Sequence, residues 1–244
     1  MEKWLLNEIK YQAKMDLMEK DRKRHLIVRK CSELNVPNPA EIKSLSFGEM
    51  VECIEGDISN LLSRFTNLKK ISFTYQFKHK INPQLLNMWL SVLPSIEELS
   101  FSSISNNSIT WNDLKRLNLS KIKSLYVSME DTSHPISIYA PKLEEFTIYG
   151  SSNVELSLIE KRCLKRNKFD FSGMPSLKKV KLSYCDFWDY SSLSCLNKLE
   201  SIHIVDRNLD NIFWLSSNYS LSKLIVFGSL ESLSGINTQP NLIH

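Results

Sequence analysis

The stretch Leu177–Cys185, Leu-Lys-Lys-Val-Lys-Leu-Ser-Tyr-Cys, decides the fold of this chain. Apolar residues occupy its first, fourth and sixth positions, and its ninth residue is a cysteine. The same 1-4-6 apolar register recurs along the 244 residues. The eight copies are Ile42/Leu45/Phe47, Leu68/Ile71/Phe73, Ile96/Leu99/Phe101, Ile122/Leu125/Val127, Leu143/Phe146/Ile148, Leu177/Val180/Leu182, Leu199/Ile202/Ile204 and Leu221/Leu224/Val226. This recurrence indicates a chain built from repeats of one structural unit.

The spacing of the copies identifies the unit. Successive first positions lie 26, 28, 26, 21, 34, 22 and 22 residues apart. Six of the seven intervals fit the about 20 to 29 residues of a leucine-rich repeat, whose L-x-x-L-x-L-x-x-(N/C) core the copies resemble. Each core is predicted to be a short strand with its fourth and sixth residues pointing inward. Stacked repeats bury these residues, so the sequence predicts an α/β leucine-rich repeat solenoid with a curved parallel sheet.

The segments between the strands change character along the chain. In the first three intervals apolar residues recur at helical period, and Asn82-Pro83 is typical of a helix start. Helices are therefore predicted on the convex side of the N-terminal half. Alternating apolar residues in the C-terminal half predict extended or irregular convex segments. They are Ile136, Ile138 and Ala140, then Val154, Leu156 and Leu158.

One elongated repeat domain with an N-terminal cap is predicted. Residues 1–40 form an N-terminal helical cap, because apolar residues recur at helical spacing over 2–34 and a solenoid has an apolar end to cover. A docking helix and a basic arm for an anionic surface remain open alternatives for this segment. Residues 41–244 form the leucine-rich repeat domain of about eight repeats. Leu242 falls where a ninth repeat would begin, so we expect that repeat to be cut short and the natural chain to be longer; the alternative is that a partner or a second copy covers this end.

Charge, hydropathy and cysteine content limit the possible functions and locations of the protein. The net charge of +4 comes entirely from residues 1–30, which hold nine Lys or Arg and five Asp or Glu, so the basic pI describes a local patch. No run reaches the roughly 18 apolar residues of a membrane span, and the N-terminus lacks the features of a signal peptide. Five cysteines without a Cys-x-x-Cys pair suit reduced thiols. We therefore expect a cytoplasmic or nuclear protein.

The third, fifth and seventh positions of each core alternate to the concave face of the sheet. The first three repeats carry mostly small hydroxyl residues there, whereas the later repeats carry aromatic, cationic and branched side chains. Because binding energy concentrates in desolvated aromatic anchors, a partner protein is predicted to bind the later repeats. The predicted partner-binding residues are Tyr126, Tyr149, Lys179, Lys181, His203, Val205, Ile225 and Phe227.

The second position of the cores alternates in charge from repeat to repeat. It reads Lys43, Lys69, Glu97, Lys123, Glu144, Lys178 and Glu200. Adjacent strands lie about 4.8 Å apart, so these residues are predicted to form ion pairs that fix the register of the sheet.

The 34-residue interval contains a basic insertion, residues 160–168. Its five basic residues are Lys161, Arg162, Lys165, Arg166 and Lys168. The insertion is either a simple solvated loop or an anion-binding loop that grips phosphates or an acidic peptide. Elsewhere the five histidines are scattered, and no phosphate loop, metal-spaced pair or nucleophile motif occurs, so we predict no enzyme, cofactor or metal.

The irregular cores, Cys185 at a ninth position and the Ala-Pro-x-Leu lead in Tyr139-Ala140-Pro141-Lys142-Leu143 resemble the repeat portion of eukaryotic F-box proteins. The resemblance covers about residues 42–229, and no F-box is found in the sequence. It implies the substrate-recognition part of a ubiquitin-ligase receptor, with ligase subunits among its partners. Our first hypothesis is a non-catalytic protein–protein interaction module. The alternatives are such a receptor and a nucleic-acid-associated scaffold that uses the basic helix and loop.

Overall fold

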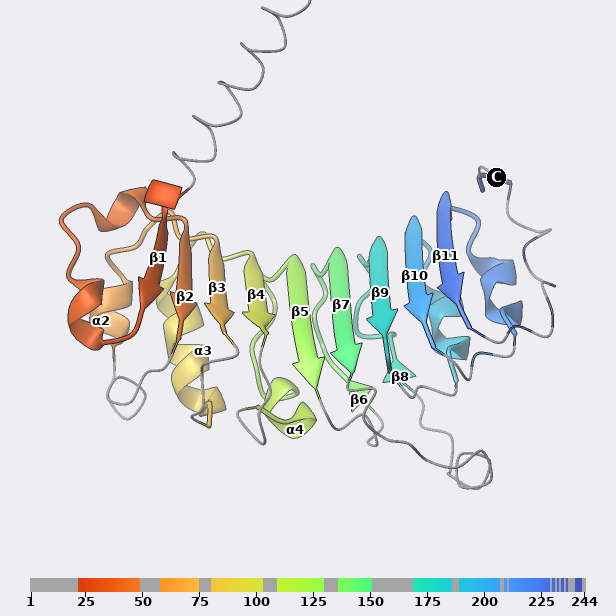
Figure 1. The fold of residues 1–244 in the computed structure, drawn as a ribbon, viewed down its shortest axis with the longest axis horizontal. Helices are drawn as coiled ribbons and strands as arrows, with labels where there is room; N and C mark the ends of the chain where they lie inside the picture. Colours follow the sequence, from red (N-terminus) through yellow and green to blue (C-terminus); the bar gives the residue numbers. More distant parts are fainter. Residues whose placement is uncertain are drawn as a thin grey trace, which may run out of the picture.

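The computed structural model describes residues 22–48, 58–74, 80–102, 109–129, 136–150, 169–185, 189–206, 209, 211–228, 230, 232, 234, 236 and 240–242. In these residues nine strands form one parallel sheet in the order β1-β2-β3-β4-β5-β7-β9-β10-β11 (Figure 1). Their bounds are β1 His25–Val28, β2 Ser44–Phe47, β3 Lys70–Phe73, β4 Glu98–Phe101, β5 Ser124–Met129, β7 Glu145–Gly150, β9 Lys179–Ser183, β10 Ser201–Val205 and β11 Lys223–Phe227. Each new strand is added beside the previous one, as in a solenoid.

The register of the sheet follows the predicted 1-4-6 pattern. Leu99 of β4 pairs with Leu125 of β5, and Phe101 pairs with Val127. The other strand pairs from β2 to β11 align fourth with fourth and sixth with sixth positions in the same way. Every fourth and sixth residue from β2 to β10 is buried, as is every first-position residue of the eight copies. The predicted leucine-rich repeat solenoid is thereby confirmed.

Strand β1 corrects the helix predicted over residues 2–34. His25–Val28 is extended and pairs with β2, with Leu26 opposite Leu45 and Val28 opposite Phe47. The first position of the repeat core that contains β1 is the exposed Lys23. The 1-4-6 apolar pattern therefore did not predict this strand. The rest of the described cap residues include two 3-10 helices, η1 Cys31–Leu34 and η2 Pro39–Glu41. Residues 1–21 lie outside the described residues, and the domain boundary at residue 40 stays a prediction.

The redox state of one cysteine differs from the prediction. Cys31 is disulfide-bonded, so the prediction that all five cysteines are reduced is wrong for this residue. Cys185 and Cys195 are free, the first buried and the second exposed.

The connections behave as predicted in both halves. Helices α2 Ser59–Leu62, α3 Pro83–Val92 and α4 Trp111–Leu114 fall in the first three intervals. The Asn82 side chain caps α3 by accepting hydrogen bonds from two backbone N–H groups of its first turn, and Pro83 follows it. The later connections hold the strands β6 Ile136–Ser137 and β8 Phe169–Asp170, which pair with each other, and the 3-10 helices η3 Ser191–Cys195 and η4 Phe213–Ser217. The alternating Val154, Leu156 and Leu158 lie outside the described residues.

Aromatic side chains at the sixth position form the core of the N-terminal half. The ring of Phe73 stacks on Phe47 at 5.5 Å and on Phe101 at 5.3 Å between centroids. Trp89 of α3 packs against Phe47 at 5.7 Å, which holds the helix on this side of the sheet. The side chains at positions three, five and seven lie on the opposite side. We call that side the open face; it is the face that the sequence predicted to be concave.

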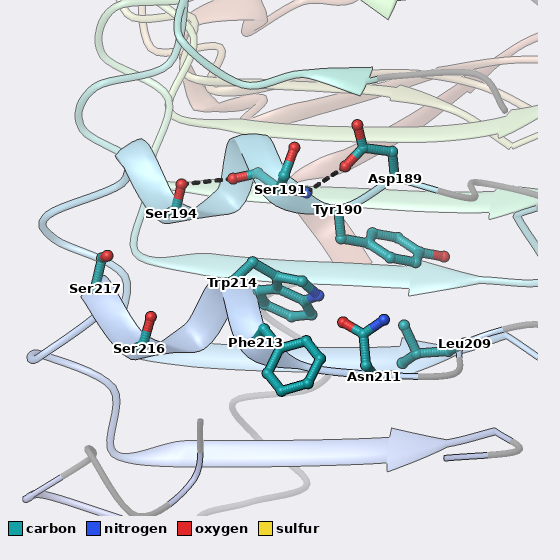
Figure 2. Close-up of a pocket in the computed structure, with 10 residues that line it drawn as sticks. All are labelled: Asp189, Tyr190, Ser191, Ser194, Leu209, Asn211, Phe213, Trp214, Ser216 and Ser217. Carbon is teal, nitrogen blue, oxygen red and sulfur yellow. Dashed lines mark hydrogen bonds between the residues drawn. The ribbon is translucent and has the colours of Figure 1, made fainter. Parts of the chain in front are cut away.

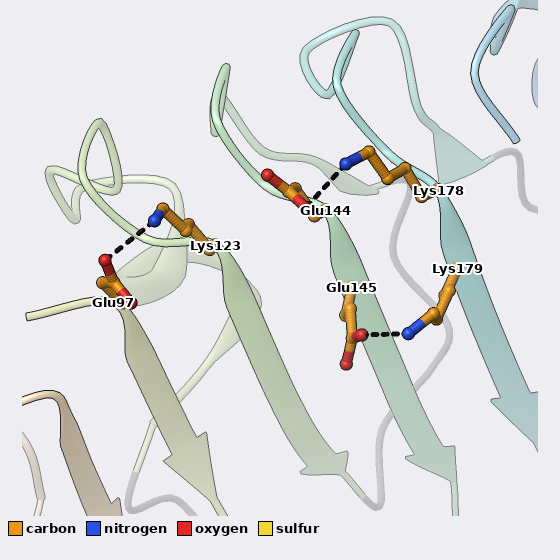
Figure 3. Close-up of polar contacts among 6 residues, drawn as sticks. All are labelled: Glu97, Lys123, Glu144, Glu145, Lys178 and Lys179. Atoms are coloured by element: carbon orange, nitrogen blue, oxygen red, sulfur yellow. Dashed lines mark hydrogen bonds and ion pairs between the residues drawn. The ribbon is translucent and has the colours of Figure 1, made fainter.

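Three of the predicted ion pairs form between neighbouring repeats. Glu97 lies 2.8 Å from Lys123, and Glu144 lies 2.9 Å from Lys178 (Figure 3). Glu97 also lies 3.9 Å from Lys69. Two further pairs on the open face join third positions. They are Lys70 with Glu98 at 3.6 Å and Lys179 with Glu145 at 2.5 Å. These pairs support the register, but exposed pairs contribute little to stability individually.

The ion pairs predict an acid-sensitive component of stability. The hydrogen bond from Lys123 lowers the pKa of Glu97, and that from Lys178 lowers the pKa of Glu144. A carboxyl group whose pKa is lower in the folded than in the unfolded state stabilises the folded state at pH values above its unfolded-state pKa. This stabilisation is lost as the pH falls through the folded-state pKa. Between about pH 6 and pH 3, urea unfolding should therefore show a smaller loss of stability in Glu97→Gln/Glu144→Gln than in the wild type. Equal losses in both proteins would contradict this assignment.

Candidate functional site

The register brings the predicted partner-binding residues together in rows that cross the strands of the open face. The fifth-position row runs Tyr126, Thr147, Lys181, His203 and Ile225 from β5 to β11. The seventh-position row runs Tyr149, Ser183, Val205 and Phe227 from β7 to β11. Lys179 stands in the third-position row and pairs with Glu145. All eight predicted residues therefore share one face of five neighbouring strands.

The seventh-position row has an exposed aromatic ring at each end. Tyr149 is 45% exposed and Phe227 is 62% exposed, although both belong to regular strands. They stand three strand spacings apart, about 14 Å, with Ser183 and Val205 between them. These fractions are high for large apolar groups, so the row offers apolar area that a partner can bury.

Tyr184 extends this aromatic area and was missed by the sequence analysis. It directly follows β9, and its ring packs edge-to-face on Tyr149 with 5.4 Å between centroids. Its φ of 54° lies in the left-handed region, which interrupts the alternation of side chains that the prediction assumed. A Cβ on Gly150 would lie 2.1 Å from the Tyr184 carbonyl oxygen, so only glycine permits this close approach of β7 to the turn.

The fifth-position row contains two groups whose burial changes their titration. Burial is the main reason that the pKa of Tyr126 is raised, with a smaller contribution from Tyr149. Burial also lowers the pKa of His203, and the positive charges of Lys181 and Lys223 lower it further. Tyr126 and His203 are therefore neutral at neutral pH. His203 Nε2 is inaccessible to solvent and has no hydrogen-bond partner among the described residues, and the ring lies 6.2 Å from that of Phe227.

The open face carries an excess of positive charge at its C-terminal end. Lys181 of β9 and Lys223 of β11 flank the strand of His203, and neither forms an ion pair with a described residue. In the N-terminal half Lys70 is matched by Glu98. Lys223 was not among the predicted site residues, although it lies in the third-position row together with Lys179.

The N-terminal half of the open face offers less to a partner. Ser46, Ser72 and Ser100 of its fifth-position row are each only 8% exposed, since neighbouring strands cover their short side chains. Ile27 of β1 is the exception at 50% exposure, and the sequence analysis did not select it. The difference between the halves agrees with the composition that led to the prediction.

A separate pocket lies on the other side of the sheet, between η3 and η4 (Figure 2). Its volume is about 530 Å³. The lining residues are Asp189, Tyr190, Ser191, Ser194, Leu209, Asn211, Phe213, Trp214, Ser216 and Ser217. Tyr190 donates a buried hydrogen bond to the Asp206 carboxylate, and the Asp189 carboxylate accepts from the Ser191 backbone N–H at 2.8 Å.

One predicted site falls outside the described part of the chain. The anion-binding loop, Lys161, Arg162, Lys165, Arg166 and Lys168, lies outside it. Within it, no three His, Cys, Asp or Glu side chains gather in a way that could hold a metal ion. None of its helices has the length and apolar character needed to cross a membrane.

Comparisons with known proteins add little to this geometry. No protein-family model matches the sequence, and no curated protein matches it either. Among solved structures, an internalin from Listeria monocytogenes is similar over 87% of this chain, with 13% sequence identity and a TM-score of 0.43. The match covers 62% of the internalin chain, so the present chain spans less than two thirds of that structure's length.

Proposed function

We propose that this chain is a non-catalytic protein–protein interaction module that binds a partner on the open face of strands β5 to β11. The observation that carries the proposal is the row from Tyr149 to Phe227, with Tyr184 beside it, in which large rings are exposed on regular strands. Rings held on a sheet lose little conformational freedom on binding, and aromatic residues are enriched among the groups that dominate interface energies.

The shape of the surface favours a protein over a small molecule. The exposed rings stand about 14 Å apart on neighbouring strands, and the residues between them, Ser183 and Val205, lie in the same row. A small ligand needs a concave site that encloses most of its surface. A protein surface or an extended peptide can contact both rings at once.

The proposal is tested by affinity capture with three forms of the chain. They are the wild type, the open-face variant Tyr149→Ala/Phe227→Ala, and a control variant, Phe213→Ala/Tyr219→Ala, that removes two exposed aromatic rings outside the open face. A partner retained by the wild type and the control but lost by the open-face variant supports the proposal. A partner lost only by the control variant contradicts it.

The same capture at low and high salt separates the alternative functions. A mainly aromatic protein interface should survive high salt, whereas nucleic-acid binding falls steeply as salt rises. Ubiquitin-ligase subunits among the retained proteins would support the receptor function. The cytoplasmic or nuclear location stays a prediction.

A further inference from the structure

We infer that the partner presents an acidic segment to the open face, with a carboxylate placed over His203 between Lys181 and Lys223. This inference rests on the proposed function and specifies the chemistry of the partner. It depends on three neighbouring strands: β9 carries Lys181, β10 carries His203 and β11 carries Lys223.

The charge distribution is the first argument. Among the described third-, fifth- and seventh-position residues of β7 to β11, the cations are Lys179, Lys181 and Lys223, and the anion is Glu145. Glu145 is bound by Lys179 at 2.5 Å. Two lysines therefore remain without an anion on the face, and they stand on either side of one strand. A bound carboxylate would balance both of them, and complementary charge is what gives an interface its specificity.

The second argument is the apolar frame around this cationic site. Phe227 and Ile225 of β11 lie next to Val205 and His203 of β10. A partner that covers these side chains excludes water, which strengthens the attraction between its carboxylate and the two lysines. The segment should therefore combine acidic with apolar residues.

Binding of a carboxylate should also change the state of His203. The groups facing it are Lys181, with Lys179, on β9 and Lys223 on β11, and its own strand offers Ser201 and Val205. The acidic residues nearest to His203 in sequence lie outside β10. Glu200 directly precedes the strand, and Asp206, which directly follows it, is buried and accepts a hydrogen bond from Tyr190. An added carboxylate counteracts the two lysines, so the pKa of His203 should rise on binding, and affinity should increase as the pH falls.

Nucleic acid fits this surface less well than an acidic segment. Two unpaired lysines could neutralise only about two phosphates, whereas proteins that depend on phosphate contacts use roughly six to ten. An acidic peptide needs only one or two carboxylates in register with the lysines, together with contacts to the rings.

The test is a selection from a displayed library of random peptides roughly ten residues long, enough to span the rows in extended form. Selected peptides are titrated against the wild type, Lys181→Glu/Lys223→Glu, and Lys142→Glu/Lys198→Glu. The last variant makes the same charge change on exposed turn lysines and is the matched control. We expect peptides rich in Asp and Glu, at least a tenfold loss of affinity in the first variant, and little change in the control. Nuclear magnetic resonance of the His203 ring should show its pKa rising when peptide binds.

Other outcomes separate the inference from the proposed function. Peptides that need Tyr149 and Phe227 but lack acidic residues and tolerate Lys181→Glu/Lys223→Glu would overturn the inference and leave the binding face in place. Failure to select peptides, or peptides unaffected by Tyr149→Ala/Phe227→Ala, would overturn both. A single-stranded oligonucleotide that binds more tightly than the peptides through the same lysines would also overturn the inference.

Discussion

Replacing Phe73 by alanine should lower the free energy of unfolding by about 3–5 kcal/mol. Phe73 is 3% exposed and stands in the middle of the stack that joins β2, β3 and β4. Its removal leaves a cavity that the flanking rings of Phe47 and Phe101 can fill only by moving off their own strands. Because each repeat is stabilised mainly by its neighbours, the damage should extend to the repeats on both sides.

Urea unfolding followed by circular dichroism measures this effect, and Phe213→Ala is its matched control. The control removes the same atoms from a ring that is 54% exposed, so the free energy of unfolding should change by no more than about 0.5 kcal/mol. Equal effects of the two substitutions would mean that the aromatic stack does not hold the N-terminal repeats together.

Replacing Tyr149 and Phe227 by alanine should weaken partner binding by roughly 30- to 1000-fold, equivalent to about 2–4 kcal/mol. The two rings supply the largest exposed apolar area of the seventh-position row. Neither belongs to the set of buried fourth- and sixth-position residues, so unfolding by urea should change little. Calorimetric titration of the partner found by capture measures the loss.

The control for this prediction exchanges the two aromatic residues. Tyr149→Phe/Phe227→Tyr keeps a ring at each end of the row and should bind within a few-fold of the wild type, because apolar contact is preserved. If the exchanged variant loses as much affinity as the alanine variant, the rings do not act through apolar contact. If neither variant loses affinity, the partner binds elsewhere.

Much of the fold follows from one periodic pattern. The 1-4-6 register predicted eight of the nine strands of the large parallel sheet, because burial at three fixed positions leaves a clear trace in the sequence. Strand β1 left no such trace. The exposed Lys23 stands where the pattern needs an apolar residue, and Leu26 and Val28 become part of the sheet only by pairing with β2. Tertiary pairing, which a local pattern does not contain, decided the structure of this segment.

The candidate site could be predicted to the extent that it follows the sheet. Alternation places positions three, five and seven on one face, and the parallel register then brings Tyr149 and Phe227 into one row. The position of the Tyr184 ring depends on the left-handed backbone conformation of Tyr184 itself and on the absence of a side chain at Gly150. No periodic rule therefore predicts its packing on Tyr149. Likewise, the unbalanced charge of Lys223 becomes visible only when ion pairs are assigned across strands.

Photo-crosslinking tests the central claim, that the open face of β5 to β11 binds the partner, most directly. A photoreactive phenylalanine analogue takes the place of Phe227 on the open face in one protein and of Phe213 in η4 in another, since both rings are more than half exposed. Illumination in the presence of the partner should give a crosslinked product from position 227 and none from position 213. Crosslinking from position 213 alone would contradict the account and place the partner on the side of the sheet that carries the pocket.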